Sequence, residues 1–232
     1  MSEEGAAAKL KVFISYSRRD CGAFAEELLA GLELVGFEPF LDRHDIAAGE
    51  DWETRLAGLI QAADTIVYVV SPEAVRSERC AWEVEKATSL AKRLIPVVAI
   101  AVTEAEVPES LKRLNYIFFN EPHSFARALG ELSSALRTDL DWIREHTRLG
   151  ELAARWQQRN RLEALLLRGD ELEAAKAWMA KWASGAPQLT DAHRAFIAAS
   201  AEAEALRASK ERLQIEEMAK AQAARAQALS ER

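Results

Sequence analysis

Cysteine is scarce in this sequence, and long apolar runs are missing. Only two cysteines, Cys21 and Cys80, occur among the 232 residues, and each lies in an otherwise amphipathic segment. We therefore expect two buried thiols in a reducing compartment and no disulfide framework. No stretch of about 18 apolar residues is present, and residues 1–5 lack the basic and apolar regions of a secretory signal. These absences predict a soluble, cytoplasmic protein.

The motifs of several well-known nucleotide and metal sites are also missing. No Gly-x-Gly-x-x-Gly follows the first predicted strand, which argues against a hydride-transfer dinucleotide fold, and there is no Walker-type loop. The four histidines are scattered and, together with the two cysteines, show no metal-ligand spacing. We expect neither a metal ion nor a bound cofactor.

The charge balance excludes two further classes of partner. The net charge is −7, and the acidic excess lies in the first 140 residues. An acidic protein has no general attraction for phosphates of nucleic acids or for anionic membrane surfaces. We therefore expect neither nucleic acid nor a membrane as a partner.

The sequence does contain a regular alternation of apolar strands and amphipathic helices. Residues 65–70 are strongly β-branched, and residues 21–35 carry apolar side chains at helical spacing before Gly36, a predicted C-cap. Five such alternations predict an α/β fold in which helices cover both faces of a parallel sheet. The predicted strands are 10–16, 37–41, 65–70, 94–101 and 116–119, and the predicted helices are 21–35, 51–63, 73–92 and 123–137.

The strand pattern stops at residue 139, and an all-α region follows. Residues 1–9 are expected to be a flexible N-terminus and 10–138 the α/β domain. Residues 139–188 predict a small helical region with a turn at Gly169-Asp170, and its tryptophans (142, 156, 178 and 182) are expected to form its core. Residues 189–232 predict a long polar helix that serves as a linker or an assembly element, without a clean heptad pattern.

The most informative stretch is residues 12–20, Val-Phe-Ile-Ser-Tyr-Ser-Arg-Arg-Asp. The apolar run from Val12 to Ile14 predicts a buried strand, and the polar residues predict a loop at its carboxyl end. Asp20 is predicted to cap the helix that begins near Cys21. Ligands of open α/β sheets bind beyond the carboxyl ends of the strands, so this loop is a candidate ligand site.

Three stretches of the first 138 residues resemble one family. Phe13 to Asp20 looks like its box 1. Gly36-Phe-Glu-Pro-Phe-Leu-Asp42, followed by Ile46-x-x-Gly49-x-x-Trp52, looks like its second strand and BB loop. Ser71-Pro72, followed by Ser77-Glu-Arg-Cys80-Ala-Trp-Glu83, is similar to its helix-C motif. The family is the Toll/interleukin-1 receptor (TIR) domain in its bacterial form, and the resemblance implies a flavodoxin-like five-stranded parallel sheet.

The resemblance also implies an activity. Some TIR domains hydrolyse or cyclise NAD and release nicotinamide, and others only assemble with partners. The family glutamate maps to Glu83. Many enzymes of the family carry a tryptophan four residues before it, whereas this chain has Arg79 there and places Trp82 directly before the glutamate. The resemblance thus implies an NAD glycohydrolase or cyclase, with NAD as substrate, that self-association through TIR domains activates in bacterial defence or signalling. The C-terminal helices would connect it to a sensor domain or a partner protein.

Helical geometry makes a prediction for Glu83 that does not depend on the resemblance. At 100° per residue, Cys80, Val84, Ala87 and Ala91 form one apolar stripe, and Glu83 lies roughly 70° from its centre, at the rim. A carboxylate there can face the cleft at the strand ends, or it can be a solvated residue that the helix dipole favours. Glu85, about 130° from the stripe centre, is expected to face solvent.

Six further residues are candidates for substrate binding. Arg18 and its neighbour Arg19 are expected to pair with a diphosphate, or else to be solvated. Tyr16 and Ser17 would donate hydrogen bonds to ribose or phosphate, although Tyr16 could simply complete the strand. Asp42 and Arg43 open the BB loop. Trp52 would stack on a base or pack in the core beside Leu56 and Leu59.

Two other functions stay open. The same fold could be a non-catalytic interaction or adaptor module that uses the BB loop and Trp82 as contacts. It could also be an enzyme resembling nucleoside deoxyribosyltransferases, which share this fold class and a glutamate. The product of NAD cleavage would be ADP-ribose or a cyclic isomer.

Overall fold

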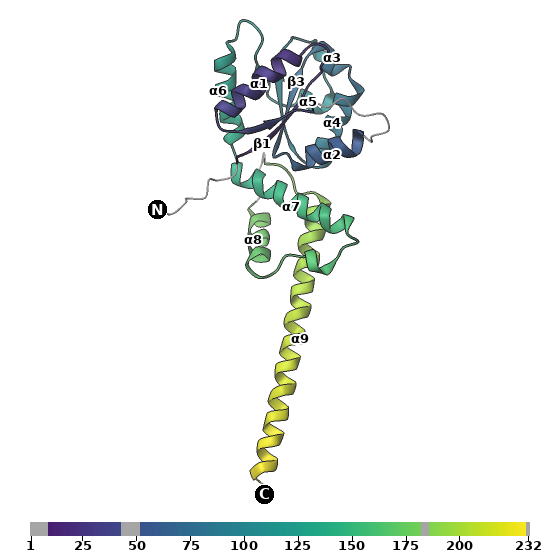
Figure 1. Cartoon of the computed structure of the whole chain (residues 1–232), viewed down its shortest axis with the longest axis vertical. Coiled ribbons are helices and arrows are strands. Elements are labelled where there is room, and N and C mark those ends of the chain that lie inside the picture. The colour runs from purple at the N-terminus through teal and green to yellow at the C-terminus, as the bar shows by residue number, and fades with distance from the viewer. Residues whose placement is uncertain (1–8, 43–51, 182–185, 231–232) are drawn as a thin grey trace, which may run out of the picture. The chain divides into compact units, whose positions relative to one another are not determined.

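The structure, a computed structural model, describes residues 9–42, 52–181 and 186–230 (Figure 1). The described chain divides into two compact units, one of residues 9–151 with 186–190 and one of residues 152–181 with 191–230. None of the helices within these ranges is both long and apolar enough to cross a membrane. The boundaries at residues 138 and 188 stay predictions.

The first unit is built on a parallel sheet. Its strand order is β2-β1-β3-β4-β5, and each neighbouring pair runs parallel. This is the flavodoxin-like order, in which the direction of strand addition reverses between β1 and β3. The predicted fold class is therefore confirmed. The strands are β1 (Lys11–Ser15), β2 (Glu38–Phe40), β3 (Thr65–Val70), β4 (Arg93–Val98) and β5 (Ile117–Phe118).

Two helices cover one face of this sheet, α1 (Gly22–Leu34) and α6 (Phe125–Arg137) (Figure 1). Leu28 and Leu32 of α1 meet Leu132 and Leu136 of α6 in a single buried cluster. Strand side chains point in opposite directions at successive residues, so each strand adds every second residue to this cluster. These strand residues are Val12, Ile14, Val67, Val69, Ile95 and Val97.

The opposite face is covered by α2 (Trp52–Ala62), α3 (Pro72–Val75), α4 (Glu78–Ser89) and α5 (Glu109–Lys112). Leu56 and Ile60 of α2 pack on Phe13 and Ile66 of the sheet, and Ala87 of α4 joins the same cluster. A second cluster, which includes Tyr68, Cys80, Val84, Val98 and Leu111, lies beneath α3, α4 and α5. The two cysteines are buried and free, as expected.

The end of α1 follows the predicted glycine cap. Gly36 has a φ of +94°, a conformation that costs glycine little because it lacks a Cβ. Its amide donates to the carbonyl of Glu33 at 3.1 Å, and the amide of Phe37 donates to Leu32 at 3.0 Å. This cap turns the chain directly into β2.

The single predicted helix over residues 73–92 is wrong, because the chain forms two helices there. Ser71 caps α3 by accepting from the amide of Ala74 at 3.2 Å, and Ser77 caps α4 by accepting from Cys80 at 3.2 Å. The second serine stops α3 after one turn and restarts the helix, since its side chain replaces a missing backbone acceptor. The start of α4 thereby faces the carboxyl edge of the sheet.

The predicted role of Asp20 as the cap of α1 is also wrong. Cys21 is the N-cap of α1 and makes no side-chain capping bond. The carboxylate of Asp20 instead accepts from the Ser71 hydroxyl and from the amide of Glu73, both at 2.9 Å. Asp20 therefore joins the loop after β1 to the first turn of α3. It accepts from these two donors instead of from an amide of α1.

Lys92 holds the base of the first unit together. Its buried ammonium donates to the carbonyls of Gln61 and Ala63 at 2.8 Å and to the Thr147 hydroxyl at 3.2 Å. Gln61 lies in the last turn of α2 and Ala63 directly follows this helix, whereas Thr147 lies in α7 (Leu140–Gln158). Burial lowers the pKa of Lys92 to about 8. Three oxygen acceptors compensate the lysine for lost water and fix the beginning of α7 on the sheet domain.

The second unit contains the end of α7, together with α8 (Gly169–Ala180) and α9 (Asp191–Ser230). Trp156 packs on Phe196 with ring centroids 5.7 Å apart, and Trp178 lies against His193. Trp142 belongs to the first unit, where its indole donates to the Pro187 carbonyl at 3.0 Å, so the expected four-tryptophan core is wrong for this residue. Trp182 lies outside the described residues. Gly169 begins α8, so it is not the predicted turn.

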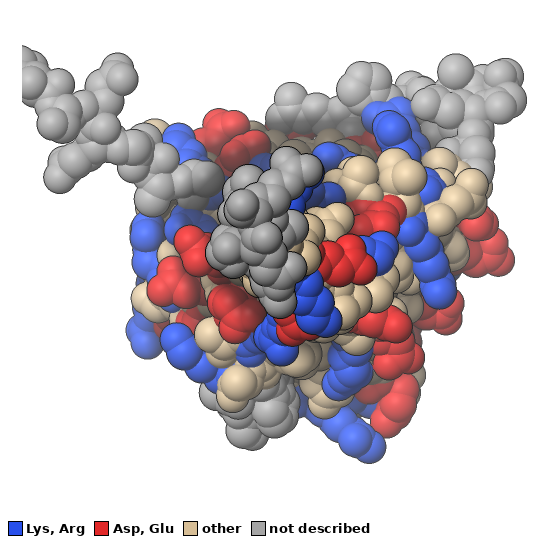
Figure 2. Space-filling model, turned by 90° about the horizontal axis from the view of Figure 1, so that it is seen from below, with Lys and Arg blue, Asp and Glu red and all other residues tan. Residues whose placement is uncertain are grey.

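The surface is mixed in charge. On the face shown in Figure 2, basic and acidic side chains of the described residues are interspersed. Several ion pairs join residues one helical turn apart, such as Arg148 with Glu145 at 2.7 Å and Lys176 with Glu173 at 2.8 Å. Exposed pairs of this kind add only about 0.3–0.5 kcal/mol each, so the fold depends on its core.

Candidate active site

A cleft of about 570 Å³ opens at the carboxyl edge of the sheet. It lies beyond the ends of β1 and β3, where the connections that follow these two strands leave the sheet on opposite faces. This is the usual ligand position in this sheet order. Its walls come from the loop after β1, from Asp42 two residues beyond β2, and from the beginnings of α3 and α4. The lining residues are Phe13, Ile14, Tyr16, Ser17, Arg18, Arg19, Asp42, Glu73, Arg76, Ser77, Glu78, Arg79, Cys80 and Glu83.

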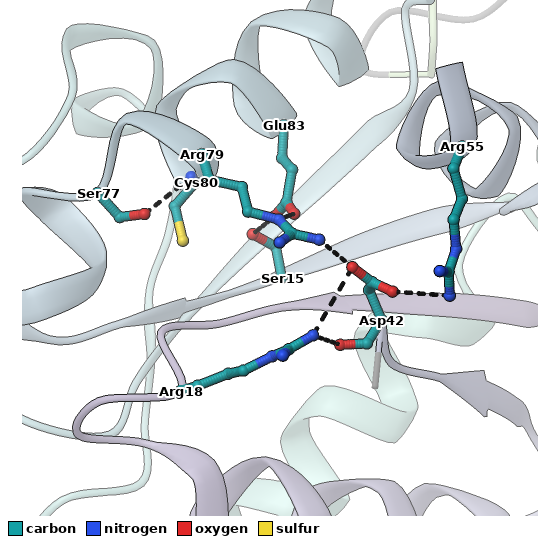
Figure 3. Close-up of polar contacts among 8 residues, drawn as sticks. All are labelled: Ser15, Arg18, Asp42, Arg55, Ser77, Arg79, Cys80 and Glu83. Atoms are coloured by element: carbon teal, nitrogen blue, oxygen red, sulfur yellow. Dashed lines mark hydrogen bonds and ion pairs between the residues drawn. The ribbon is translucent and has the colours of Figure 1, made fainter. Parts of the chain in front are cut away.

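Glu83 is the most deeply placed carboxyl group of the cleft. It is 5% exposed and lies in the second turn of α4. The hydroxyl of Ser15, the last residue of β1, donates to its Oε2 atom (Figure 3). Loss of water raises the pKa of Glu83 to about 7, although Ser15 and Arg79 pull in the opposite direction and Asp42 adds to the increase. A carboxyl group that titrates near neutral pH is a feature of reactive sites.

Asp42 is a second buried carboxylate, 6% exposed, two residues beyond the end of β2. Arg79 forms an ion pair with it, and Arg55 of α2 places a guanidinium nitrogen 3.1 Å from its Oδ1 atom. Arg18 donates to the Asp42 carbonyl at 2.8 Å (Figure 3). Three guanidinium groups therefore meet at one aspartate, which offsets the cost of burying its charge.

Arg79 connects the two buried carboxylates. Besides its pair with Asp42, its Nε atom lies 3.8 Å from Oε1 of Glu83, one helical turn further along α4. Its guanidinium carbon also lies 5.9 Å from the ring centre of Trp52, within the range of a cation–π contact. In Figure 3 the Arg79 side chain extends between the two acids.

Cys80 lies beside Glu83 but is not an activated thiol. Burial and the neighbouring Glu83 raise the pKa of Cys80 to about 11, so the group stays a thiol at neutral pH. Tyr68, from β3, is fully buried beneath α4, and its pKa is also raised, chiefly by burial. Among the described residues, no group of three metal-ligating side chains could hold an ion.

The mouth of the cleft is more exposed and is lined by arginines. Arg19 pairs with Glu73 at 3.2 Å, and Arg76 pairs with Glu106 at 2.9 Å. Both arginine side chains are more than half exposed, so these pairs are weak and can exchange for another anion. The cleft thus combines cationic groups near its mouth with a carboxyl group at its floor.

The sequence from residue 12 to residue 133 matches the family model described as the TIR domain. This match spans more than half of the chain. The chain belongs to the TIR domain family. No curated protein matches it.

Several solved TIR structures are similar to this TIR protein. The TIR domain of the Toll-related receptor TRR-2 from Hydra magnipapillata is 20% identical, with 55% of this chain and 98% of that chain covered and a TM-score of 0.47. A TIR-STING receptor from C. gigas, in complex with 2′,3′-cGAMP, is 22% identical, with 53% and 39% covered and a TM-score of 0.44. The TIR domains of the activated Roq1 resistosome are 19% identical, with 62% and 84% covered and a TM-score of 0.37.

The TIR cleft collects most of the residues that the sequence singled out. Tyr16, Ser17, Arg18 and Asp42 line it together with Glu83. Tyr16 also packs against the core beneath α1 and α6, so it serves the fold as well. Arg43 lies outside the described residues. The roles of all these residues in binding or catalysis stay predictions.

Two tryptophans of the TIR domain lie beside the cleft and not in it. Trp52 packs half-buried in the α2–α4 cluster, and its ring meets that of Trp82 edge-on with centroids 5.2 Å apart. Trp52 still contacts the site through Arg79. This contact partly buries Trp82, so the tryptophan packs against α2 although it points away from the apolar stripe of its own helix.

The sequence did not predict the contacts that three residues make in the site. Ser15 points to the same side of the sheet as Phe13, because strand side chains alternate, and this spacing could have placed its hydroxyl beneath α4. Arg79 departs from the family pattern, and its four-residue spacing from Glu83 is a signal for the ion pair that the structure contains. Arg55 gave no local signal, since its partner Asp42 comes from another segment.

Proposed function

We propose that this TIR protein cleaves the bond between nicotinamide and ribose in NAD, with Glu83 as its catalytic carboxylate. The observation that carries the proposal is the buried Glu83 at the floor of the cleft, bound by Ser15 and titrating near pH 7. The cleft volume of about 570 Å³ suits a dinucleotide, since ligand pockets typically measure about 300–1,000 Å³.

The chemistry requires a carboxylate more than an acid. The bond between C1′ of the ribose and the ring nitrogen breaks, and its electron pair neutralises the positive nicotinamide ring. Positive charge develops on the ribose, and the Glu83 carboxylate stabilises it from the cleft floor. A water molecule then adds to C1′ and loses a proton, which gives ADP-ribose, or an internal nucleophile of the substrate adds and gives a cyclic isomer.

The remaining groups of the cleft would orient the substrate. Arg18 and Arg19 near the mouth would pair with the diphosphate, and Ser17 and Tyr16 would donate to phosphate or ribose oxygens. Asp42 and Arg43 would contact the substrate at the start of the BB loop. Trp52 would act through its contact with the Arg79 guanidinium. No metal or bound cofactor takes part in this scheme.

Self-association through TIR domains would activate the enzyme in bacterial defence or signalling, and the C-terminal helices would bring copies together or connect to a sensor. The far part of α9 exposes four large apolar side chains, Leu206, Leu213, Ile215 and Met218. Apolar side chains in such number on one exposed helix favour contact with another protein surface.

The test is to incubate the concentrated full chain with NAD and to measure free nicotinamide. We expect release by the wild-type protein and a loss of at least about 100-fold in Glu83→Gln, the size expected when a charge-stabilising group is removed. Glu85→Gln, on the exposed side of the same helix, should retain the activity. If no nicotinamide forms at any protein concentration, the interaction-module function is favoured. Base exchange on deoxynucleosides without NAD cleavage would favour the deoxyribosyltransferase-like function.

A further inference from the structure

Arg79 occupies a distinctive position between two buried acids. It makes an ion pair with Asp42, and its Nε atom lies 3.8 Å from Oε1 of Glu83. Asp42 follows β2 and Glu83 belongs to α4, so one guanidinium joins two separate walls of the cleft. The side chain is 33% exposed, which places it at the cleft surface where substrate would pass.

We propose that Arg79 is a positioning residue that holds Glu83 in its ionised form, and that Asp42 regulates this effect by competing for the same guanidinium. The proposal rests on the function proposed above for Glu83. It assigns to Arg79 an electrostatic role at the position where many enzymes of the family carry a tryptophan.

The physical argument begins with the charge on Glu83. A buried carboxyl group prefers to be neutral, and a nearby guanidinium favours the carboxylate. Arg79 acts in this direction, and Asp42 acts against it. Asp42 does so in two ways, because it repels a negative Glu83 directly and because it draws the guanidinium toward itself.

The competition also matters for the reaction. Positive charge that develops on the ribose is stabilised by a free carboxylate and opposed by a guanidinium held close to that carboxylate. Asp42 takes the shorter of the two contacts with Arg79, which leaves Glu83 in part available for the substrate. Removing the charge of Arg79 and removing the charge of Asp42 should therefore shift the ionisation of Glu83 in opposite directions.

Other groups face Glu83 from several elements, and the experiment must hold them constant. Ser15 donates to it from β1, and the Cys80 thiol and Tyr68 hydroxyl stay neutral near pH 7. The groups that surround Glu83 are Ser15 and Arg18 from β1 and its loop, Asp42 after β2, Tyr68 from β3, and Arg79 and Cys80 from α4. Arg18, Asp42 and Arg79 are the members of this group whose electrostatic influence on Glu83 the two variants probe.

The experiment compares Arg79→Met with Asp42→Asn in the full chain. We measure the titration midpoint of Glu83 by carbon-13 NMR of its carboxyl group, identified by its loss in Glu83→Gln, and the acidic midpoint of NAD cleavage. Arg79→Met should move both midpoints up by about one pH unit, and Asp42→Asn should move both down. Arg79→Lys, which retains the positive charge, should shift both midpoints by less than Arg79→Met does. Lys86→Met, a charge change on the same helix outside the cleft, should leave the midpoint in place.

The two readouts separate the possible failures. If NAD is not cleaved but the NMR midpoints move in opposite directions, the proposed function fails and the role of Arg79 in ionising Glu83 stands. If both variants move the midpoint in the same direction, or if neither moves it, the positioning role is overturned. Should Arg79→Met fail to fold, Arg79→Gln, which also removes the positive charge, replaces it with the same expected upward shift.

Discussion

The hydroxyl of Ser15 donates a hydrogen bond to Oε2 of Glu83, although the two residues lie 68 positions apart. Ser15 ends β1, and Glu83 lies in the second turn of α4. The bond joins β1 to α4 beside the boundary between β1 and β3, where the direction of strand addition reverses. It contacts the most buried carboxyl group of the cleft. This contact makes the properties of Glu83 sensitive to the strand beneath it.

Replacing Ser15 should alter the pH dependence of activity. In Ser15→Ala the donor is lost, so the pKa of Glu83 should rise further above its value of about 7. NAD cleavage should then fall several-fold at pH 6 and recover in part at pH 9. A pH–rate profile of the two proteins checks this, and an unchanged acidic midpoint would show that the hydrogen bond does not act on Glu83.

Glu83→Gln should change stability with pH in a defined direction. In the unfolded chain a glutamate titrates near 4.5, and Glu83 in the folded chain titrates near 7. Between these values the folded state holds more protons, so wild-type stability falls as the pH rises from 4.5 to 7 and stays lower above it. The glutamine variant lacks this loss.

The size of that effect follows from the two pKa values. At about 1.4 kcal/mol per pH unit, the stability of Glu83→Gln relative to wild type should increase by up to about 3 kcal/mol between pH 4.5 and pH 8. Urea unfolding at both pH values measures it. A difference that is constant with pH, or that shrinks as the pH rises, would contradict a buried carboxyl group that prefers its neutral form.

Asp20 should matter for stability through its bonds to α3. Asp20→Ala removes acceptors from the Ser71 hydroxyl and the Glu73 amide and should cost about 2 kcal/mol of unfolding free energy. Asp20→Asn retains one acceptor oxygen and should cost less. The double mutant Asp20→Ala/Ser71→Ala should lose less unfolding free energy than the sum of the two single losses. A double-mutant cycle by urea unfolding measures this difference. Strict additivity would mean that the two side chains do not act together.

Truncation of α9 should separate folding from assembly. The side chains of residues 208–225 are exposed, so ending the chain after Ser209 should change the melting temperature by less than about 2 °C. If self-association uses this helix, activity per molecule should become less dependent on protein concentration in the shortened chain. A large drop in melting temperature would show that the far part of α9 packs on the rest of the protein.

The centre of the sheet could be predicted from local pattern because β1, β3 and β4 are largely buried. Residues 65–70 form β3 as predicted, and Gly36 ends α1 as predicted, since β-branched residues and a glycine cap act through neighbours in the sequence. The break between α3 and α4 does not follow from the apolar pattern. Ser77 supplies a second N-cap in the middle of a helical pattern, and a continuous helix satisfied the same apolar spacing.

The candidate site was only partly predictable. Helical spacing predicts Glu83 at the rim of the apolar stripe, and the structure places it in the cleft. Glu83 is more deeply buried than a rim residue because it contacts Ser15 at the end of β1. The meeting of Arg55 and Arg79 at Asp42 depends on three segments, and no local pattern encodes such a meeting. The same reason explains Asp20, whose partners lie more than fifty residues away.

The near-neutral titration of Glu83 has a calorimetric consequence. At pH 7 the group is about half protonated, and a ligand with a cationic ring binds better beside the carboxylate than beside the acid. Each binding event should then release about half a proton to the buffer. The measured heat of binding at pH 7 will therefore include the ionisation enthalpy of the buffer, and its variation between phosphate and Tris counts the protons that leave Glu83.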